Sequence, residues 1–268
     1  MATLAIRREE WLDRIAFGVA VCAGGFAVAE AVFIVPIMHY APVAGDLALY
    51  LDATRRWIAG GPFYPPDQLA GPYLVYNGAH AILYPPTAIL LFAPFLVLPV
   101  FLWWAIPVSI VGWAIVRHRP SPVGWALVAL GVADPLLWSG IQTGNPGLWV
   151  MAAVALGTHY GWPAVAVFIK PSVFPFALIG VRGRAWWIAF AAGLLLSLPF
   201  LPMFPDWIAS MVNARGPRSG LLYSSLDVLG LSIPVVAWVF GERRPAWIAR
   251  LLAVIPRLAA DGPAARDA

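Results

Sequence analysis

The sequence predicts an all-α, polytopic bundle of about 7–9 transmembrane segments, and three observations lead to it. Hydrophobic residues make up 61% of the 268 residues and charged residues 11%, whereas a soluble domain has about 45–50% and about 25%. The apolar run Ile15–Met38, of 24 residues, can cross a bilayer as one helix. Further apolar runs follow, separated by short arginine-bearing segments. This composition argues against a soluble enzyme, a disordered chain or a nucleic-acid partner, despite the net charge of +4.

The first apolar run is too long for the apolar region of a signal peptide, which has about 7–15 residues, so we expect an uncleaved span. Arg7, Arg8 and Arg14 precede or open this span, which places the N-terminus in the cytoplasm by the positive-inside rule. Cys22 is the single cysteine and the four histidines are scattered. We therefore expect no disulfide within the chain, no metal site and no cofactor.

The mixed segments define the expected topology of a single integral-membrane domain, 1–268. Residues 39–84 and 205–226 are expected to form the first and second extracytoplasmic loops, because aromatic and polar side chains interrupt the apolar runs there. Residues 182–184 are expected on the cytoplasmic side. Residues 243–268 form a cytoplasmic tail whose first part is expected to be a short interfacial helix.

The long apolar stretch 85–116 leaves two alternatives open. It can form one tilted span, which puts Arg117–Arg119 inside, or two helices that break near Leu98-Pro99, which puts these arginines outside. The prolines within the stretch argue against a straight helix of 30 residues.

The first outer segment carries the most informative side chains. On a helix, Asp46, Tyr50 and Ala53 share one face, and Gly60-Gly61-Pro62 would end that helix. A carboxylate at the mouth of a membrane helix tends to face a cavity, where it can accept a proton from a substrate hydroxyl as a general base. Asp52 is instead expected to pair with Arg55 or Arg56, which lie three and four residues further along.

Short motifs follow one another in a fixed order: Asp46-x-x-x-Tyr50-x-x-Ala53, then Gly60, Tyr64 and Tyr84-Pro85-Pro86, then Gly144-Asn145-Pro146-Gly147, and finally Lys170-Pro171. In this order and membrane context the chain resembles glycosyltransferase family 87. Members of that family are polyprenyl-phosphate-mannose-dependent mannosyltransferases of the GT-C superfamily. Asn145 stands where the family often has Gln, and Gly147 where it has Asn, although Gln142 lies nearby. The chain is also shorter than most members.

The resemblance implies a GT-C-like membrane enzyme in a bacterial-type inner membrane. The donor would be a polyprenyl-phosphate sugar, by resemblance mannose, and the acceptor an extracytoplasmic glycan or glycolipid hydroxyl. Asp46 would be the catalytic base of an inverting hexosyl transfer. The candidate substrate-binding residues are Tyr50, Tyr64, Tyr84, Gln142, Asn145, Lys170, Arg215 and Arg218.

Some assignments stay open at the level of sequence. Lys170 lies in an apolar stretch, where a charge needs a partner: either Glu30 or Asp134 in an ion pair, or the phosphate of a donor. Arg215 and Arg218 suit a lipid phosphate, but can equally snorkel to lipid headgroups. A non-catalytic membrane subunit or truncated homologue, and a lipid or solute transporter, remain the alternative functions.

Overall fold

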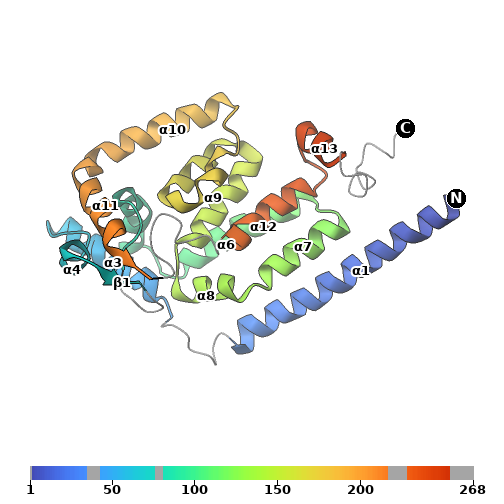
Figure 1. The fold of residues 1–268 in the computed structure, drawn as a ribbon, viewed down its shortest axis with the longest axis horizontal. Helices are drawn as coiled ribbons and strands as arrows, with labels where there is room; N and C mark the ends of the chain where they lie inside the picture. The colour runs from blue at the N-terminus through green and yellow to red at the C-terminus, as the bar shows by residue number, and fades with distance from the viewer. Residues whose placement is uncertain (1, 35–42, 76–80, 217–227, 254–268) are drawn as a thin grey trace.

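The computed structural model describes residues 2–34, 43–75, 81–216 and 228–253. Within these ranges the chain is mostly helical, which confirms the predicted all-α class (Figure 1). The two strands of the described chain, β1 (Tyr73–Leu74) and β2 (Ala214–Arg215), form a parallel pair of two residues each. They tie the segment after α4 to the segment after α11.

The helices follow in two groups along the chain. The first group is α1 (Ala2–Ala29), the π-helical turn η1 (Glu30–Ile34), α3 (Gly45–Ile58), α4 (Pro66–Ala70), η2 (Pro86–Ala88), α5 (Ile89–Phe92) and η3 (Ala93–Leu96). The second group is α6 (Leu102–His118), α7 (Pro122–Val132), α8 (Pro135–Thr143), α9 (Gly147–Tyr160), η4 (Trp162–Ile169), η5 (Pro171–Leu178), α10 (Arg184–Ser197), η6 (Leu198–Met203), α11 (Phe204–Asn213), α12 (Val228–Val239) and α13 (Ala246–Ala253). Elements η2 to η6 are 3₁₀ helices.

Two described helical stretches, Glu10–Val32 and Arg184–Asn213, are long and apolar enough to cross a membrane. The pair α7–α8 adds a third if its 55° bend lies within one span. The expected number of about 7–9 segments is thus supported only as far as two or three. Prolines account for the difference, because they divide the other apolar runs into shorter pieces.

The stretch 85–116 is divided in this way. The pieces η2, α5 and η3 run from Pro86 to Leu96, and α6 begins only at Leu102. The break of the second alternative is therefore present, and a single straight helix of 30 residues is not. The first piece is also too short to cross a bilayer, since a helical span needs about 20 residues.

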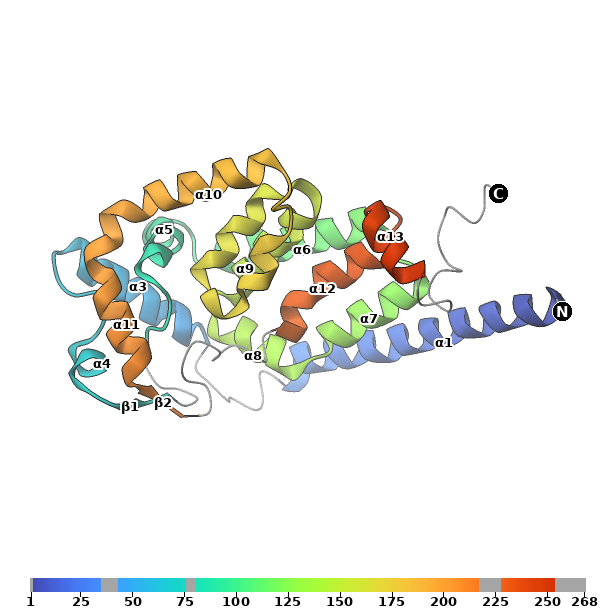
Figure 2. The ribbon, with the colours of Figure 1, turned by 45° about the horizontal axis from the view of Figure 1, so that its top comes forward.

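Helix α1 lies along the outside of the body and packs lengthwise on α7 (Figures 1 and 2). The buried residues Ala16, Ala23 and Ala27 of α1, and Glu30 at the start of η1, recur at intervals of seven, four and three and so lie on one side of the helix. Small alanines allow the two backbones to approach closely. From Ile15 onward the exposed side chains of α1 are apolar, as expected for a helix in lipid, whereas the exposed Glu10, Asp13 and Arg14 precede this part.

Two clusters of buried side chains form the interior. One is aliphatic and joins α6, α9 and α12. The other is aromatic and joins α3, η2, α5 and η6, with Tyr50, Tyr84, Phe92 and Trp103 among its members. Trp104 packs against both clusters. The turn between α8 and α9 lies against α3 and α6, between these two clusters.

Candidate functional site

Asp46 stands in the first turn of α3, where the helix dipole favours a negative charge. Its carboxylate is half-buried and is held by one oxygen only. Asp46 Oδ2 accepts hydrogen bonds from Thr143 Oγ1 and Asn145 Nδ2, both at 3.0 Å. Asp46 Oδ1 has no hydrogen-bond partner among the described residues. These two hydrogen bonds to Oδ2 thus fix the orientation of the side chain.

The amide of Asn145 has one possible orientation. Its Oδ1 accepts from the backbone N–H of Gly147 at 2.8 Å and from the Tyr84 hydroxyl at 3.2 Å. A backbone N–H can only donate, so the amide oxygen must face it and the NH₂ group must face Asp46. Asn145 therefore links Tyr84 to the Asp46 carboxylate.

The backbone of the α8–α9 turn is held in place from two sides. Ala44 N, just before α3, donates to Gln142 O at 2.8 Å. From α6, the indole of Trp103 donates to Gly144 O at 3.0 Å. Gly144 has φ +73°, and a Cβ there would lie 2.8 Å from Leu47 Cβ, so glycine is required on both counts. The turn can approach α3 closely enough for its side chains to reach Asp46.

The three candidate tyrosines form one buried aromatic group. The Tyr64 hydroxyl donates to Tyr84 O at 2.8 Å. The Tyr50 ring stacks on Phe92 at 4.7 Å and meets the Tyr84 ring edge-on at 5.3 Å. Tyr84 reaches Asn145 with its hydroxyl, so Tyr50 and Tyr64 position Tyr84 through these contacts.

Lys170 lies beside this aromatic group, at the junction of η4 and η5, and is 1% exposed. Its Nζ is 5.7 Å from the centroid of the Tyr84 ring, within the range of a cation–π contact. It is also 3.7 Å from the point where a Cβ on Gly147 would stand. The fold thus brings a buried cation next to the residues that hold Asp46.

The other candidate residues are distributed differently. Arg215 is exposed on β2, and its guanidinium donates to the carbonyls of Val212 and Ala214, at the end of α11. None of the contacts of the described residues joins Arg215 to Asp46, Thr143 or Asn145. Gln142 is half-buried on α8 and contributes its carbonyl to the turn. Arg218 lies outside the described residues.

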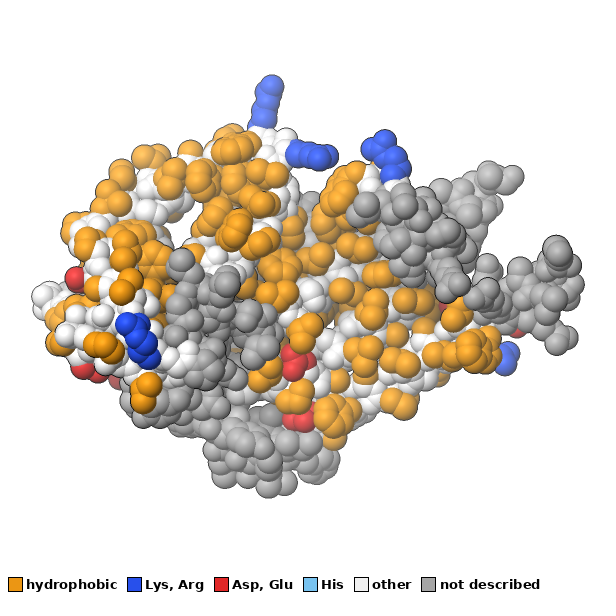
Figure 3. Space-filling model, in the orientation of Figure 1, with side chains coloured by type: hydrophobic (Ala, Val, Ile, Leu, Met, Phe, Trp, Pro, Cys, Tyr) orange, Lys and Arg blue, Asp and Glu red, His pale blue; other side chains and the backbone are white. Residues whose placement is uncertain are grey.

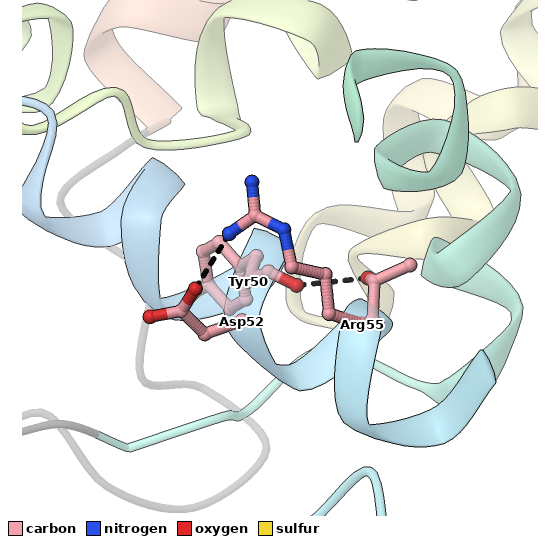
Figure 4. A network of polar contacts seen from close by, with 4 residues as sticks. Tyr50, Asp52 and Arg55 are labelled. Atoms are coloured by element: carbon pink, nitrogen blue, oxygen red, sulfur yellow. Dashed lines mark hydrogen bonds and ion pairs between the residues drawn. The ribbon is translucent and has the colours of Figure 1, made fainter. Parts of the chain in front are cut away.

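Of the other carboxylates named in the sequence analysis, Asp52 forms the predicted ion pair, whereas the ion pairs of the described chain do not include Glu30 or Asp134. Asp52 pairs with Arg55 at 2.7 Å on the exposed side of α3 (Figure 4). Asp134 caps α8 by accepting from the N–H of Leu136 at 3.0 Å. Glu30 is buried in η1, beside α8.

Thr143 is the one contact of Asp46 that sequence reasoning missed. It lies 97 residues from Asp46 in the chain, so no local periodicity connects the two. A usable signal was its position: a hydroxyl side chain at the end of a helix, directly before Gly144-Asn145. Such a side chain lies on the same turn as the candidate amide.

The arrangement combines the oriented carboxylate of Asp46, the Asn145 amide that holds it, the Tyr84 phenol that holds the amide, and the buried ammonium group of Lys170. The carboxylate can accept a proton at its open oxygen, and the ammonium group can stabilise negative charge that develops nearby. Groups of three or more His, Cys, Asp or Glu side chains that could hold a metal ion are not found in the described part of the chain. Comparison of the sequence and structure with protein-family models, curated proteins and solved structures gives no match.

Proposed function

We propose that this chain is an integral-membrane glycosyltransferase that moves a hexose, mannose by resemblance, from a polyprenyl-phosphate donor to an acceptor hydroxyl. The observation that carries the proposal is the geometry of Asp46. Two hydrogen bonds hold its Oδ2, and Oδ1 has no hydrogen-bond partner among the described residues. The motifs behind the resemblance to glycosyltransferase family 87, separated by up to 124 residues between Asp46 and Lys170, support it further because contacts link them in a chain. Asn145 donates to Asp46, Tyr84 donates to Asn145, and Lys170 lies over the Tyr84 ring.

In the proposed reaction the acceptor hydroxyl gives its proton to Asp46 Oδ1 as its oxygen attacks the anomeric carbon of the donor sugar. The bond between that carbon and the lipid-phosphate oxygen breaks, and the phosphate leaves with the bonding electrons. A single displacement of this kind inverts the anomeric carbon. Thr143 and Asn145 keep the carboxylate from rotating, which fixes the proton acceptor relative to the attacking oxygen.

The leaving phosphate gains negative charge in this step and needs a cation. Lys170 is the buried cation nearest to the turn that holds Asp46. A positive charge in a site of low dielectric stabilises a developing anion more strongly than the same charge does in water. We therefore propose that Lys170 binds the phosphate of the donor, and that the acceptor hydroxyl lies next to Asp46 Oδ1.

The proposed setting is a bacterial-type inner membrane with the N-terminus in the cytoplasm. The stretch Glu10–Val32 would carry the chain across, so that α3 and Asp46 lie at the outer face. The arginine-bearing turn after α6 lies against the turn after α12 and belongs to the other end of the molecule (Figure 2). The partners would be the bilayer, the polyprenyl-phosphate donor and a glycan or glycolipid acceptor.

A lipid or solute transporter is the second candidate, favoured by the break at Lys170. Two short helices meet there at a buried charge, as in transporters whose broken helices bind substrate. A transporter would move its substrate without any change of covalent bonds. The two candidates therefore differ in their products.

The test uses the purified chain with polyprenyl-phosphate mannose labelled in the sugar, and a total membrane-lipid extract that supplies acceptors. The glycosyltransferase proposal predicts release of polyprenyl phosphate together with a new labelled glycolipid or glycan. If the label stays on the polyprenyl phosphate but crosses the bilayer of proteoliposomes, the transporter is the better description. If neither occurs, both proposals fail for the chain alone, and a non-catalytic subunit becomes the preferred assignment.

A further inference from the structure

The exposed tryptophan and tyrosine side chains of the described chain have an uneven distribution. They are Trp11, Trp113, Trp125, Tyr160, Trp162, Trp187 and Trp247. Five of them, Tyr160 and Trp162 being the exceptions, lie within six residues of an arginine in the sequence. Large amphipathic rings beside basic side chains are typical of the interface between a bilayer and water.

Tyr160 and Trp162 are distant from arginines in the sequence, but the fold brings them close to a basic turn. Gly161 lies between them, and its backbone packs on Gly180, where a Cβ on Gly161 would come within 3.1 Å of the Gly180 Cα. The basic turn with Arg182 and Arg184 follows directly. Figure 3 shows basic side chains that project from the upper edge of the molecule, beside the start of α10 and beside α13. We name these exposed rings and arginines the basic aromatic rim.

At the centre of the basic aromatic rim, hydrogen bonds join the turn after α6 to the turn after α12. Glu242 N donates to His118 O at 3.0 Å, and Ser121 N donates to Phe240 O at 2.9 Å, so the turns after α6 and α12 are held together. These bonds bring Arg117, Arg119, Arg243 and Arg244 to one place. The acidic side chain at the centre is Glu242, which is exposed and pairs with Arg119 at 3.3 Å.

The positive field of this centre acts on its neighbours. Burial is the main cause that lowers the pKa of His159, and Arg243 and Arg117 lower that pKa further. Both guanidinium groups therefore lie close enough to the histidine to oppose a further positive charge. The two guanidinium groups together give this part of the surface a concentrated positive charge, which an anion can neutralise.

We propose that the basic aromatic rim binds the phosphate groups of anionic phospholipids, with Arg117 and Arg243 as its central contacts. Arginine suits this partner because its planar fork donates parallel hydrogen bonds to phosphate oxygens. A lipid surface fits better than a nucleic acid, because the exposed tryptophans and apolar helices lie next to the arginines and would enter the bilayer. This site is separate from Asp46 and does not depend on the proposed enzyme activity.

The test compares Arg117→Gln/Arg243→Gln with Arg55→Gln/Arg56→Gln, which removes the same charge from α3. Each full-length protein is reconstituted into nanodiscs of phosphatidylcholine alone, or of phosphatidylcholine and phosphatidylglycerol in about equal parts, and the midpoint of thermal unfolding is measured. We expect phosphatidylglycerol to raise the midpoint of the unchanged protein and of the α3 variant by about 2–4 °C. The Arg117/Arg243 variant should lose most of this rise.

An equal rise in both variants, or no rise in the unchanged protein, would overturn the proposal. A comparable rise with dissolved inorganic phosphate in phosphatidylcholine nanodiscs would also overturn it, because the partner would then not be a lipid. Should the glutamine variant fail to fold, Arg117→Lys/Arg243→Lys with native mass spectrometry replaces it. This variant keeps the charge but loses the fork, and we expect it to retain fewer phosphatidylglycerol molecules than the unchanged protein; equal retention would contradict the role of the two guanidinium groups.

Discussion

Asn145 donates its amide hydrogen to Asp46 Oδ2 at 3.0 Å, although 99 residues separate the two in the chain. The amide cannot turn over without placing its NH₂ group against the N–H of Gly147. The Tyr84 hydroxyl binds the same amide oxygen. A single turn between two helices therefore fixes the orientation of the carboxylate that we propose as the general base.

Removing the amide should reduce transfer more than it reduces folding. Asn145→Ala takes away one of the two donors to Asp46 and frees the carboxylate to rotate, so we expect kcat to fall by about 100-fold. KM for the donor should change much less. Steady-state kinetics of polyprenyl phosphate release measure both. An unchanged kcat in a folded Asn145→Ala protein would remove this residue from the mechanism.

Thr143 offers a milder change with a matched control. Thr143→Val has a similar shape but lacks the hydroxyl, so one hydrogen bond to Asp46 Oδ2 is lost. We expect activity to fall by about 10-fold, the effect of roughly 1.4 kcal/mol. Thr143→Ser keeps the hydroxyl and should retain most of the activity. Equal activity of the valine and serine variants would contradict the assignment.

Gly144 should be intolerant of a side chain for structural reasons. Gly144→Ala places a Cβ against Leu47 in a left-handed backbone conformation, which should cost about 1–3 kcal/mol of the free energy of unfolding. Gly112, inside α6, has open space around its Cβ position. Gly112→Ala should therefore be neutral or slightly stabilising. Thermal unfolding in the same detergent compares them, and a Gly144→Ala protein as stable as Gly112→Ala would refute the close packing of the turn.

The stacked pair His118 and His159, whose ring centroids are 4.0 Å apart, should make the fold sensitive to acid. Burial, His159 and Arg243 lower the pKa of His118 from 6.5 to about 4. The unfolded chain then binds more protons than the folded chain between these values. Stability is full above about pH 6.5 and falls as the pH drops toward about 4, by on the order of 3 kcal/mol.

Thermal unfolding of the unchanged protein and of His118→Gln at several pH values measures this effect. Thr158 donates its hydroxyl hydrogen to Ala155 O at 2.7 Å and accepts from His118 Nε2, also at 2.7 Å. Glutamine can supply such a donor without titrating. The variant should lose less stability on acidification, and an identical loss would show that other groups, such as the carboxylates, are responsible. Arg117 and Tyr160 are the other titratable neighbours of the pair.

Local features of the structure were predictable because local chemistry determines them. The shared face of Asp46, Tyr50 and Ala53 follows from helical periodicity, and α3 ends at Ile58, just before the predicted Gly60 turn, where φ is +84°. The pairing of Asp52 with Arg55 follows from their spacing of three residues. The break before α6 follows from the prolines in the apolar stretch.

Other features depend on contacts between distant segments and could not be derived in this way. Lys170 lies in an apolar stretch, but its place beside the Tyr84 ring depends on how the 3₁₀ segments η4 and η5 pack against the rest of the chain. The position of Arg215 on β2, where its guanidinium binds the carbonyls of Val212 and Ala214, depends on how the preceding helix α11 ends. The contact of Thr143 with Asp46 requires the complete packing of the α8–α9 turn against α3.

The most direct measurement of the central claim is the rate of sugar transfer by Asp46→Asn beside that of Asp52→Asn. Both changes remove one negative charge from α3, but Asp52 is exposed and paired with Arg55. We predict that Asp46→Asn lowers the rate of polyprenyl phosphate release by about 1,000-fold or more, while Asp52→Asn stays within about twofold of the unchanged protein. If Asp46→Asn transfers the sugar as fast as Asp52→Asn, then Asp46 is not the general base and the proposed mechanism is wrong.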